Sequence, residues 1–129
     1  MAHGAPTCVD DIPLYLKNIR GGTESSPEVI QIIRDRYEAI GGSSPLLEIT
    51  RGQAENLEKF LNQNGGNFKV YIGMRNWVPY ISNVVKQMLE DGVEKILALC
   101  LAPQYSTWST KLYFNALNDA LEKNSKGTL

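Results

Sequence analysis

The feature that most constrains the fold is the uninterrupted apolar run ILALCLA at residues 96–102. Such a run is apolar on both faces, which is typical of a parallel strand covered by helices on both sides. A second segment, FKVYIGM at residues 68–74, alternates and is rich in residues that favour strands. The sequence therefore predicts strands over 68–74 and 93–103, and with them an α/β fold with a parallel sheet.

Helical periodicity fills much of the remaining chain. Apolar residues at helical spacing predict a helix over 12–19 with Asp10 as its N-cap. Pro27 in a first turn predicts a second helix over 27–40, which stops at the Gly41–Gly42 pair. Further helices are predicted over residues 50–63, 77–91 and 107–123. The order strand, helix, strand, helix in the C-terminal half supports the α/β assignment.

The N-terminus has the pattern of an incomplete strand. Two strands make too small a sheet for a chain of 129 residues that is 43% hydrophobic. The opening MAHGAP has the pattern of the last residues of a strand followed by its loop to the next helix. We therefore expect a first strand that is largely missing from the centre of the sheet. The apolar faces of its neighbours would then be exposed, which favours instability or self-association.

Charge and composition exclude several classes of protein. The formal net charge is −1 and no cluster of Lys and Arg occurs, which argues against nucleic acid as a partner. No apolar run approaches the ~20 residues that span a bilayer. Cys8 and Cys100 are far apart and follow no metal-binding spacing, and Cys100 is expected to be a small buried residue. Nothing here requires an oxidising compartment, so a cytoplasmic location is expected.

The predicted sheet brings three loops to one edge, where ligands of such sheets bind. These loops carry His3, Arg75, Tyr105, Ser106, Thr107 and Trp108. His3 is the one histidine of the chain, and its position leaves a structural role and a ligand role equally open. The sequence has no G-x-S-x-G, P-loop lysine or G-x-G-x-x-G motif, and one histidine is too few for a zinc site or a catalytic triad. The segment RDRYEAIGGSSP is either a solvated helix end or a carboxylate-binding edge, and its composition favours the former.

Four blocks of the sequence resemble the N-terminal half of the ferrochelatase family, in particular its bacterial coproporphyrin type. They are MAHGAP, RYEAIGGSSPL, YIGMRNWVPYI and LAPQYSTWS, in the order and spacing of the family. The resemblance covers nearly the whole chain. It implies insertion of ferrous iron into a porphyrin, coproporphyrin III or protoporphyrin IX, held between two flavodoxin-like lobes during haem biosynthesis. Residues 1–129 are then expected to form the first lobe, a chelatase-type three-layer domain.

The resemblance also implies which residues contact the porphyrin. The positions that match are His3, Arg20, Arg36, Tyr37, Ser44 and Tyr113. His3 stands where many bacterial members have a tyrosine that reaches the porphyrin metal, and imidazole is also a good axial ligand for iron. The usual basic neighbour of Arg20 is Gly21 here, and Gln104 stands where relatives often have a histidine.

By the same resemblance, the His and Glu essential for metal insertion belong to the second lobe. Neither segment occurs in these 129 residues, so no catalytic residue is expected in this chain. We expect it to be inactive alone, as a fragment, a truncated reading frame or an isolated domain of the enzyme. Iron and porphyrin are expected as substrates, with no tightly bound cofactor.

Two alternative functions remain open from the sequence. The first is a stand-alone tetrapyrrole- or haem-binding module without chelatase activity, which a gene ending at Leu129 would favour. The second is a small homodimeric chelatase, for which one histidine per chain is too few for the usual pair of ligands. A reading frame that continues into a second lobe with His and Glu would favour the enzyme half.

Overall fold

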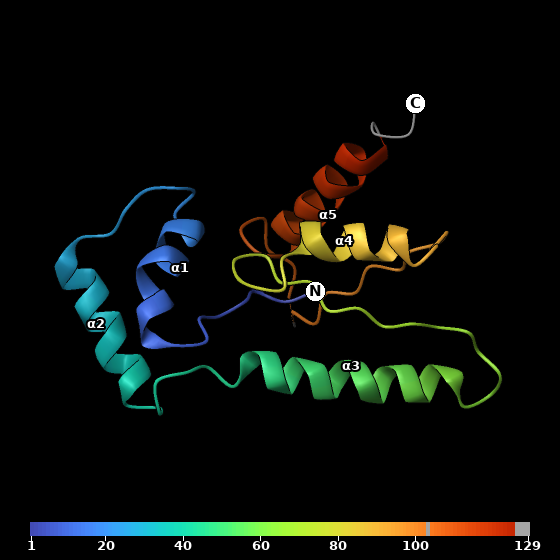
Figure 1. Ribbon diagram of the computed structural model, residues 1–129, viewed down its shortest axis with the longest axis horizontal. Coiled ribbons are helices and arrows are strands. Elements are labelled where there is room, and N and C mark those ends of the chain that lie inside the picture. Colours follow the sequence, from blue (N-terminus) through green and yellow to red (C-terminus); the bar gives the residue numbers. More distant parts are fainter. Residues whose placement is uncertain (103, 126–129) are drawn as a thin grey trace.

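The computed structural model describes residues 1–102 and 104–125 of the chain (Figure 1). Five α-helices and one short 3-10 helix form within these residues. Their bounds in chain order are η1 Val9–Asp11, α1 Ile12–Ile19, α2 Pro27–Glu38, α3 Leu46–Asn62, α4 Ile81–Glu90 and α5 Thr110–Ser125. In Figure 1, α1 and α2 lie together at one end, α4 crosses α5, and α3 runs along one side.

Helix α1 has the predicted bounds, but the predicted N-cap is wrong. The turn η1 precedes α1, so that Asp11 rather than Asp10 occupies the N-cap position. The Asp11 carboxylate accepts hydrogen bonds from the Thr7 hydroxyl at 2.8 Å and from the Cys8 backbone N–H at 3.2 Å. These hydrogen bonds, that of Thr7 first, lower the pKa of Asp11. Asp10 instead pairs with Arg34 at 3.3 Å, which links η1 to α2.

Helix α2 begins at the predicted proline and ends two residues before the predicted end. The chain leaves the helix through the Gly41–Gly42 pair, where φ is 95° and 84°. Positive φ is unfavourable for residues with a Cβ, so this turn requires glycine. The Gly42 N–H donates to the Tyr37 carbonyl at 2.8 Å, which fixes the turn directly after the helix.

The other helices begin at different residues from those predicted. Helix α3 begins at Leu46 rather than Thr50, because the Ser44 hydroxyl accepts the Leu46 N–H at 3.2 Å and starts the helix early. Helix α4 begins four residues later than predicted and α5 three residues later. Before α4 the chain folds back on itself: the Met74 N–H donates to the Pro79 carbonyl at 2.7 Å. Residues 75–80 are therefore held in a loop and do not join the helix.

Neither predicted strand forms within the described residues, so the predicted parallel sheet is not present in this structure. Segments 68–73 and 93–102 run as extended coil in Figure 1, and residue 103 lies outside the described residues. The bridges found in the described part of the chain are single-residue parallel pairs, Ala2 with Met74 and Met74 with Tyr80.

The first two residues form backbone hydrogen bonds with both extended segments. The Met1 ammonium donates to the Leu99 carbonyl at 2.6 Å. On the other side, the Ala2 N–H donates to the Gly73 carbonyl and the Arg75 N–H donates to the Ala2 carbonyl, both at 3.0 Å. A strand ladder needs a backbone neighbour about 4.8 Å away along its whole length. Within the described residues these bonds do not extend into a ladder along segments 68–73 and 93–102.

The main hydrophobic core lies between α4 and α5. Its buried members are Ile81, Val85, Tyr113, Leu117 and Ala120. Ala98 and Cys100 pack against this core, and Cys100 is partly rather than fully buried. Leu97 and Leu101, on alternate positions, are 91% and 59% exposed. The prediction that helices cover both faces of this apolar run is therefore wrong for this structure, because only one face is covered.

The core predicts a contrast between two leucines of the same chain. Leu117→Ala should lower the free energy of unfolding by about 3 kcal/mol, because it leaves a cavity in the core. Leu97→Ala should change it by no more than about 0.5 kcal/mol, because that side chain is in water. Urea denaturation at low protein concentration measures both values. Equal losses for the two variants would contradict the observed core.

Candidate functional site

Three aromatic rings lie in a row next to the N-terminal loop. His3 and Tyr15 meet edge to face with ring centroids 6.4 Å apart, and Tyr15 and Trp77 do so at 6.1 Å. Gly4 allows the close approach of this loop: its φ is +86°, and a Cβ there would lie 2.7 Å from the Trp77 backbone nitrogen. Helix α1 supplies Tyr15 and the loop before α4 supplies Trp77, so the row joins three separate parts of the chain.

Asn76 contacts His3 through both its backbone and its side chain. Its backbone N–H donates to the His3 carbonyl at 2.9 Å. Its amide nitrogen lies 3.2 Å from Nδ1 and 3.3 Å from Nε2 of the imidazole. In the neutral ring one of these nitrogens carries a proton and the other an in-plane lone pair. An atom in the ring plane so near to both nitrogens would collide with Cε1. The amide nitrogen therefore lies over the ring face, and Asn76 does not occupy the lone pair of the unprotonated nitrogen.

The surroundings of His3 favour its neutral form. Partial removal of water from the ring lowers the pKa of His3 below its usual value of 6.5, and the nearby Arg75 guanidinium lowers this pKa further. The side chain nevertheless remains exposed at the surface. A neutral, accessible imidazole is the form that binds metal ions.

Two more of the predicted site residues lie near the same rings. Burial raises the pKa of Tyr15 to about 12, and the neighbouring phenols of Tyr37 and Tyr113 contribute to this rise. Burial also raises the pKa of Tyr113, while the positive charge of Arg75 opposes this rise. The structure therefore brings His3, Tyr37 and Tyr113 within electrostatic range of Tyr15 or Arg75.

The other three predicted residues lie at helix ends or in the loops that join the helices. Ser44 lies beside the N-terminal loop, where its N–H donates to the Pro6 carbonyl at 3.5 Å. Arg36 is exposed in the last turn of α2, directly before Tyr37. Arg20 follows the C-terminus of α1 and donates to the Ser25 hydroxyl at 3.1 Å. Nothing in the described part of the chain links Arg20 to His3.

The remaining residues of the predicted sheet edge are placed by the loop before α5. Tyr105 and Trp108 are 72% and 85% exposed, and the Ser106 hydroxyl accepts the Trp108 N–H at 3.2 Å. Thr107 is also exposed. Within the described residues Arg75 acts on the pKa of His3, and no such interaction links His3 to these four residues, so a common edge for the three loops stays a prediction.

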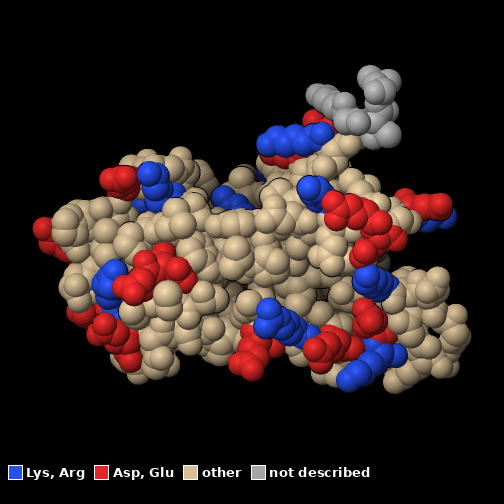
Figure 2. All heavy atoms as spheres, viewed as in Figure 1, with Lys and Arg blue, Asp and Glu red and all other residues tan. Residues whose placement is uncertain are grey.

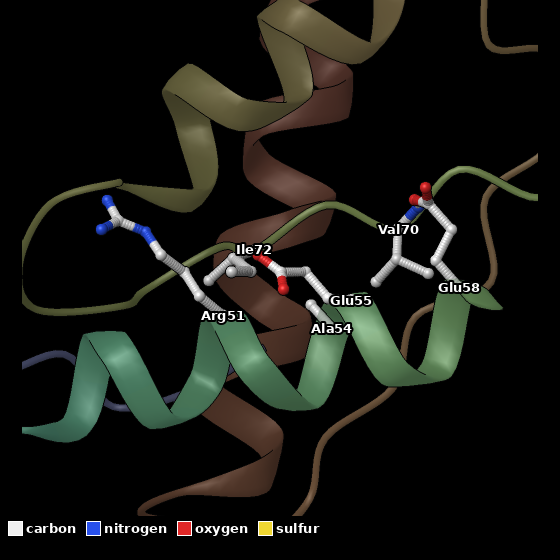
Figure 3. A pocket seen from close by; sticks show the side chains of 6 residues that line it. All are labelled: Arg51, Ala54, Glu55, Glu58, Val70 and Ile72. Carbon is white, nitrogen blue, oxygen red and sulfur yellow. The ribbon is translucent and has the colours of Figure 1, made fainter. Parts of the chain in front are cut away.

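A surface hollow lies away from the ring cluster, between α3 and the extended segment 68–73 (Figure 3). Its lining residues are Arg51, Ala54, Glu55, Glu58, Val70 and Ile72, and its volume is about 130 Å³. Pockets for small organic ligands usually enclose roughly 300–1,000 Å³. This hollow is too small for a ligand of that class, and the ring cluster remains the candidate site.

Figure 2 shows acidic and basic side chains interspersed around the margins of one face, with a broad uncharged band between them. Within residues 1–102 and 104–125, no group of three or more His, Cys, Asp or Glu side chains has an arrangement that would hold a metal ion. In the same residues, no helix has both the length and the apolar character needed to cross a bilayer.

Sequence reasoning missed Tyr15 and Asn76 as parts of the site. Tyr15 occupies an apolar position of α1, where the pattern predicts only a core residue. Asn76 follows the predicted second strand, and nothing in its type or spacing distinguishes it from an ordinary loop residue. The one available signal was its place in the loop that carries Arg75, because that loop is expected to reach the ligand-binding edge.

Comparison with known proteins decides the family of this chain. The family model described as Ferrochelatase matches residues 1–129. The chain belongs to the ferrochelatase family. It is 45% identical over 125 residues to the coproporphyrin III ferrochelatase of Oceanobacillus iheyensis, 44% over 124 residues to the ferrochelatase of Deinococcus radiodurans, and 43% over 125 residues to the coproporphyrin III ferrochelatase of Bacillus subtilis.

These alignments cover 95–96% of this ferrochelatase-family chain but only 39–40% of each relative. The chain thus spans about 40% of the length of the curated relatives it matches. Membership of the ferrochelatase family implies a chelatase-type α/β fold, although the described residues form helices without a sheet.

The electrostatics of the site predict the titration of the one histidine. NMR titration should give His3 a pKa below 6.5, and Arg75→Gln should raise that pKa without restoring it fully, because burial is the larger cause. Protonation then favours the unfolded chain, so the free energy of unfolding should fall as pH drops below 6.5 and level off below the folded pKa. A pKa of 6.5 or more in the unmodified chain would contradict the observed environment.

Proposed function

We propose that this chain is the porphyrin-binding half of a ferrochelatase that inserts ferrous iron into coproporphyrin III or protoporphyrin IX in haem biosynthesis. The observation that carries the proposal is the family match across all 129 residues. The relatives named coproporphyrin III ferrochelatase make that porphyrin the first choice as substrate. The chain alone is inactive in this proposal, because the groups that insert the metal belong to a second lobe.

The chemistry of the ring cluster suits a porphyrin. A neutral imidazole can ligate porphyrin iron, and His3 is exposed in an environment that lowers its pKa. The porphyrin carboxylates need cations, for which Arg36, Arg75 and Arg20 are candidates. Hydroxyl groups of Tyr37, Ser44 and Tyr113 are the further proposed contacts. His3 acts in this scheme as an axial ligand to the porphyrin iron.

We also propose that residues 1–129 are one lobe with a flavodoxin-like parallel sheet, in which segments 68–74 and 93–103 are strands. The parallel bridge between Ala2 and Met74 and the bond from Met1 to Leu99 support this arrangement. They put the first two residues between the two segments, as the centre of such a sheet requires.

A spectroscopic titration tests the porphyrin proposal. The purified chain is titrated with coproporphyrin III and, separately, with the iron complex of coproporphyrin III. Saturable binding of both is expected, with a shift of the Soret band of the iron complex on ligation. His3→Ala should abolish that shift and weaken binding of the iron complex about tenfold or more, because it removes the ligand.

The metal-free porphyrin is the control, because its affinity should be the same with and without His3. Free imidazole added to His3→Ala should restore the Soret shift. If neither coproporphyrin III nor its iron complex binds, the proposed porphyrin-binding role of this chain is refuted. Binding with a Soret band indifferent to His3 would refute only the axial-ligand role.

We further propose that the apolar segment 97–101, which joins no strand ladder within the described residues, drives self-association. Leu97, Leu99 and Leu101 are 91%, 47% and 59% exposed, and edge segments with unpaired backbone groups readily pair with other chains. In sedimentation velocity, the unmodified chain should form dimers or larger species at tens of micromolar. The double variant Leu97→Lys/Leu101→Lys should sediment as a monomer, because charges on an edge prevent pairing.

The matched control for this experiment is Leu14→Lys, which alters a leucine of α1 that is 55% exposed. This variant should associate like the unmodified chain. Two results would contradict a role for segment 97–101 in self-association. The first is an unmodified chain that remains monomeric, and the second is a loss of association in Leu14→Lys alone.

A further inference from the structure

We propose that Asn76 is a positioning residue for His3: its side-chain amide lies over the imidazole face, fixes the ring orientation and leaves the in-plane lone pair of the unprotonated ring nitrogen free for iron. The inference rests on the proposed function, because the orientation of the ring matters only if His3 reaches the metal of a bound porphyrin. It adds a residue that neither the sequence pattern nor the resemblance indicated.

The position of the amide distinguishes two kinds of contact. A conventional hydrogen bond to imidazole lies in the ring plane, uses one nitrogen and would occupy a lone pair that a metal needs. The Asn76 amide nitrogen instead lies 3.2 Å from Nδ1 and 3.3 Å from Nε2, which puts it over the ring face. An N–H group directed at an aromatic face makes a weak attractive contact. The contact holds the ring without blocking the ligating nitrogen.

Asn76 is itself held firmly, which a positioning residue requires. It is 3% exposed, and its backbone N–H donates to the His3 carbonyl at 2.9 Å. The Asn18 side chain of α1 donates to the Asn76 carbonyl at 3.2 Å and to the Tyr80 hydroxyl at 2.9 Å. The loop that carries Asn76 is therefore tied both to the N-terminal residues and to α1.

A second constraint on the orientation of the His3 ring comes from Tyr15. The His3 and Tyr15 rings meet edge to face at an interplanar angle of 82°. With the amide over its face and the tyrosine ring beside it, the imidazole of an otherwise exposed residue has a restricted set of orientations. If the side chain is not restricted beforehand, binding of iron must itself order it, at a cost of up to about 1 kcal/mol of conformational entropy. This cost lowers the affinity for the iron complex about fivefold.

The test compares Asn76→Ala with Asn18→Ala in the titration with the iron complex of coproporphyrin III. Asn76→Ala should weaken ligation by His3 about fivefold, read from the Soret shift, and leave the affinity for metal-free coproporphyrin III unchanged. Asn18→Ala loses hydrogen bonds to the same loop but keeps the amide over the ring, so it should ligate iron like the unmodified chain. Equal effects of both variants would show that Asn76 only supports the loop, and would overturn the inference.

A measurement on the unmodified chain does not depend on how the two asparagine variants fold. Protons over an aromatic face are shifted upfield, so the Asn76 side-chain NH₂ signals should be upfield of ordinary amide positions and should return there in His3→Ala. Ordinary positions in the unmodified chain would overturn the inference while leaving the porphyrin proposal intact. If His3→Ala leaves the Soret band of the iron complex unchanged, the ligand role and the positioning role fail together.

Discussion

The fold and the candidate site both depend on the backbone hydrogen bonds of the first three residues. Met1 bonds to Leu99 on one side, and Ala2 bridges to Met74 on the other. The His3 carbonyl then accepts the Asn76 N–H. These few bonds join the segment that packs on the α4–α5 core to the loop that carries the ring cluster. Within the described residues they do not extend into a ladder, and Leu97 and Leu101 are 91% and 59% exposed.

Helices could be predicted from the sequence because their hydrogen bonds are local. Periodicity gave both bounds of α1, and Pro27 gave the start of α2. Errors arose where a side chain altered a helix end, as the Ser44 hydroxyl does at the start of α3. Strands depend on a neighbour that is distant in sequence. The β-propensity of residues 68–74 therefore predicted a strand, but in the structure this segment pairs with the N-terminus only at Met74, through Ala2.

The candidate site divides in the same way between what residue types reveal and what only packing reveals. The resemblance indicated His3, Tyr37 and Tyr113, and the structure brings these three into one electrostatic neighbourhood. The part played by Tyr15 depends on α1 lying against the N-terminal loop, and that of Asn76 depends on the bridge at Met74. Neither contact can be recognised from local residue spacing, because each joins segments that are more than ten residues apart in the sequence.

The electrostatics of the cluster also bear on which role His3 can play. A histidine that formed an ion pair with a porphyrin carboxylate would have to be an imidazolium, yet loss of water and the Arg75 charge both lower the pKa of His3. An amide N–H over the ring face likewise disfavours a positive ring. All three influences favour the neutral form, whose in-plane lone pair binds metal. Under the proposed function the Arg75 guanidinium would meet a porphyrin carboxylate, and His3 would ligate the iron.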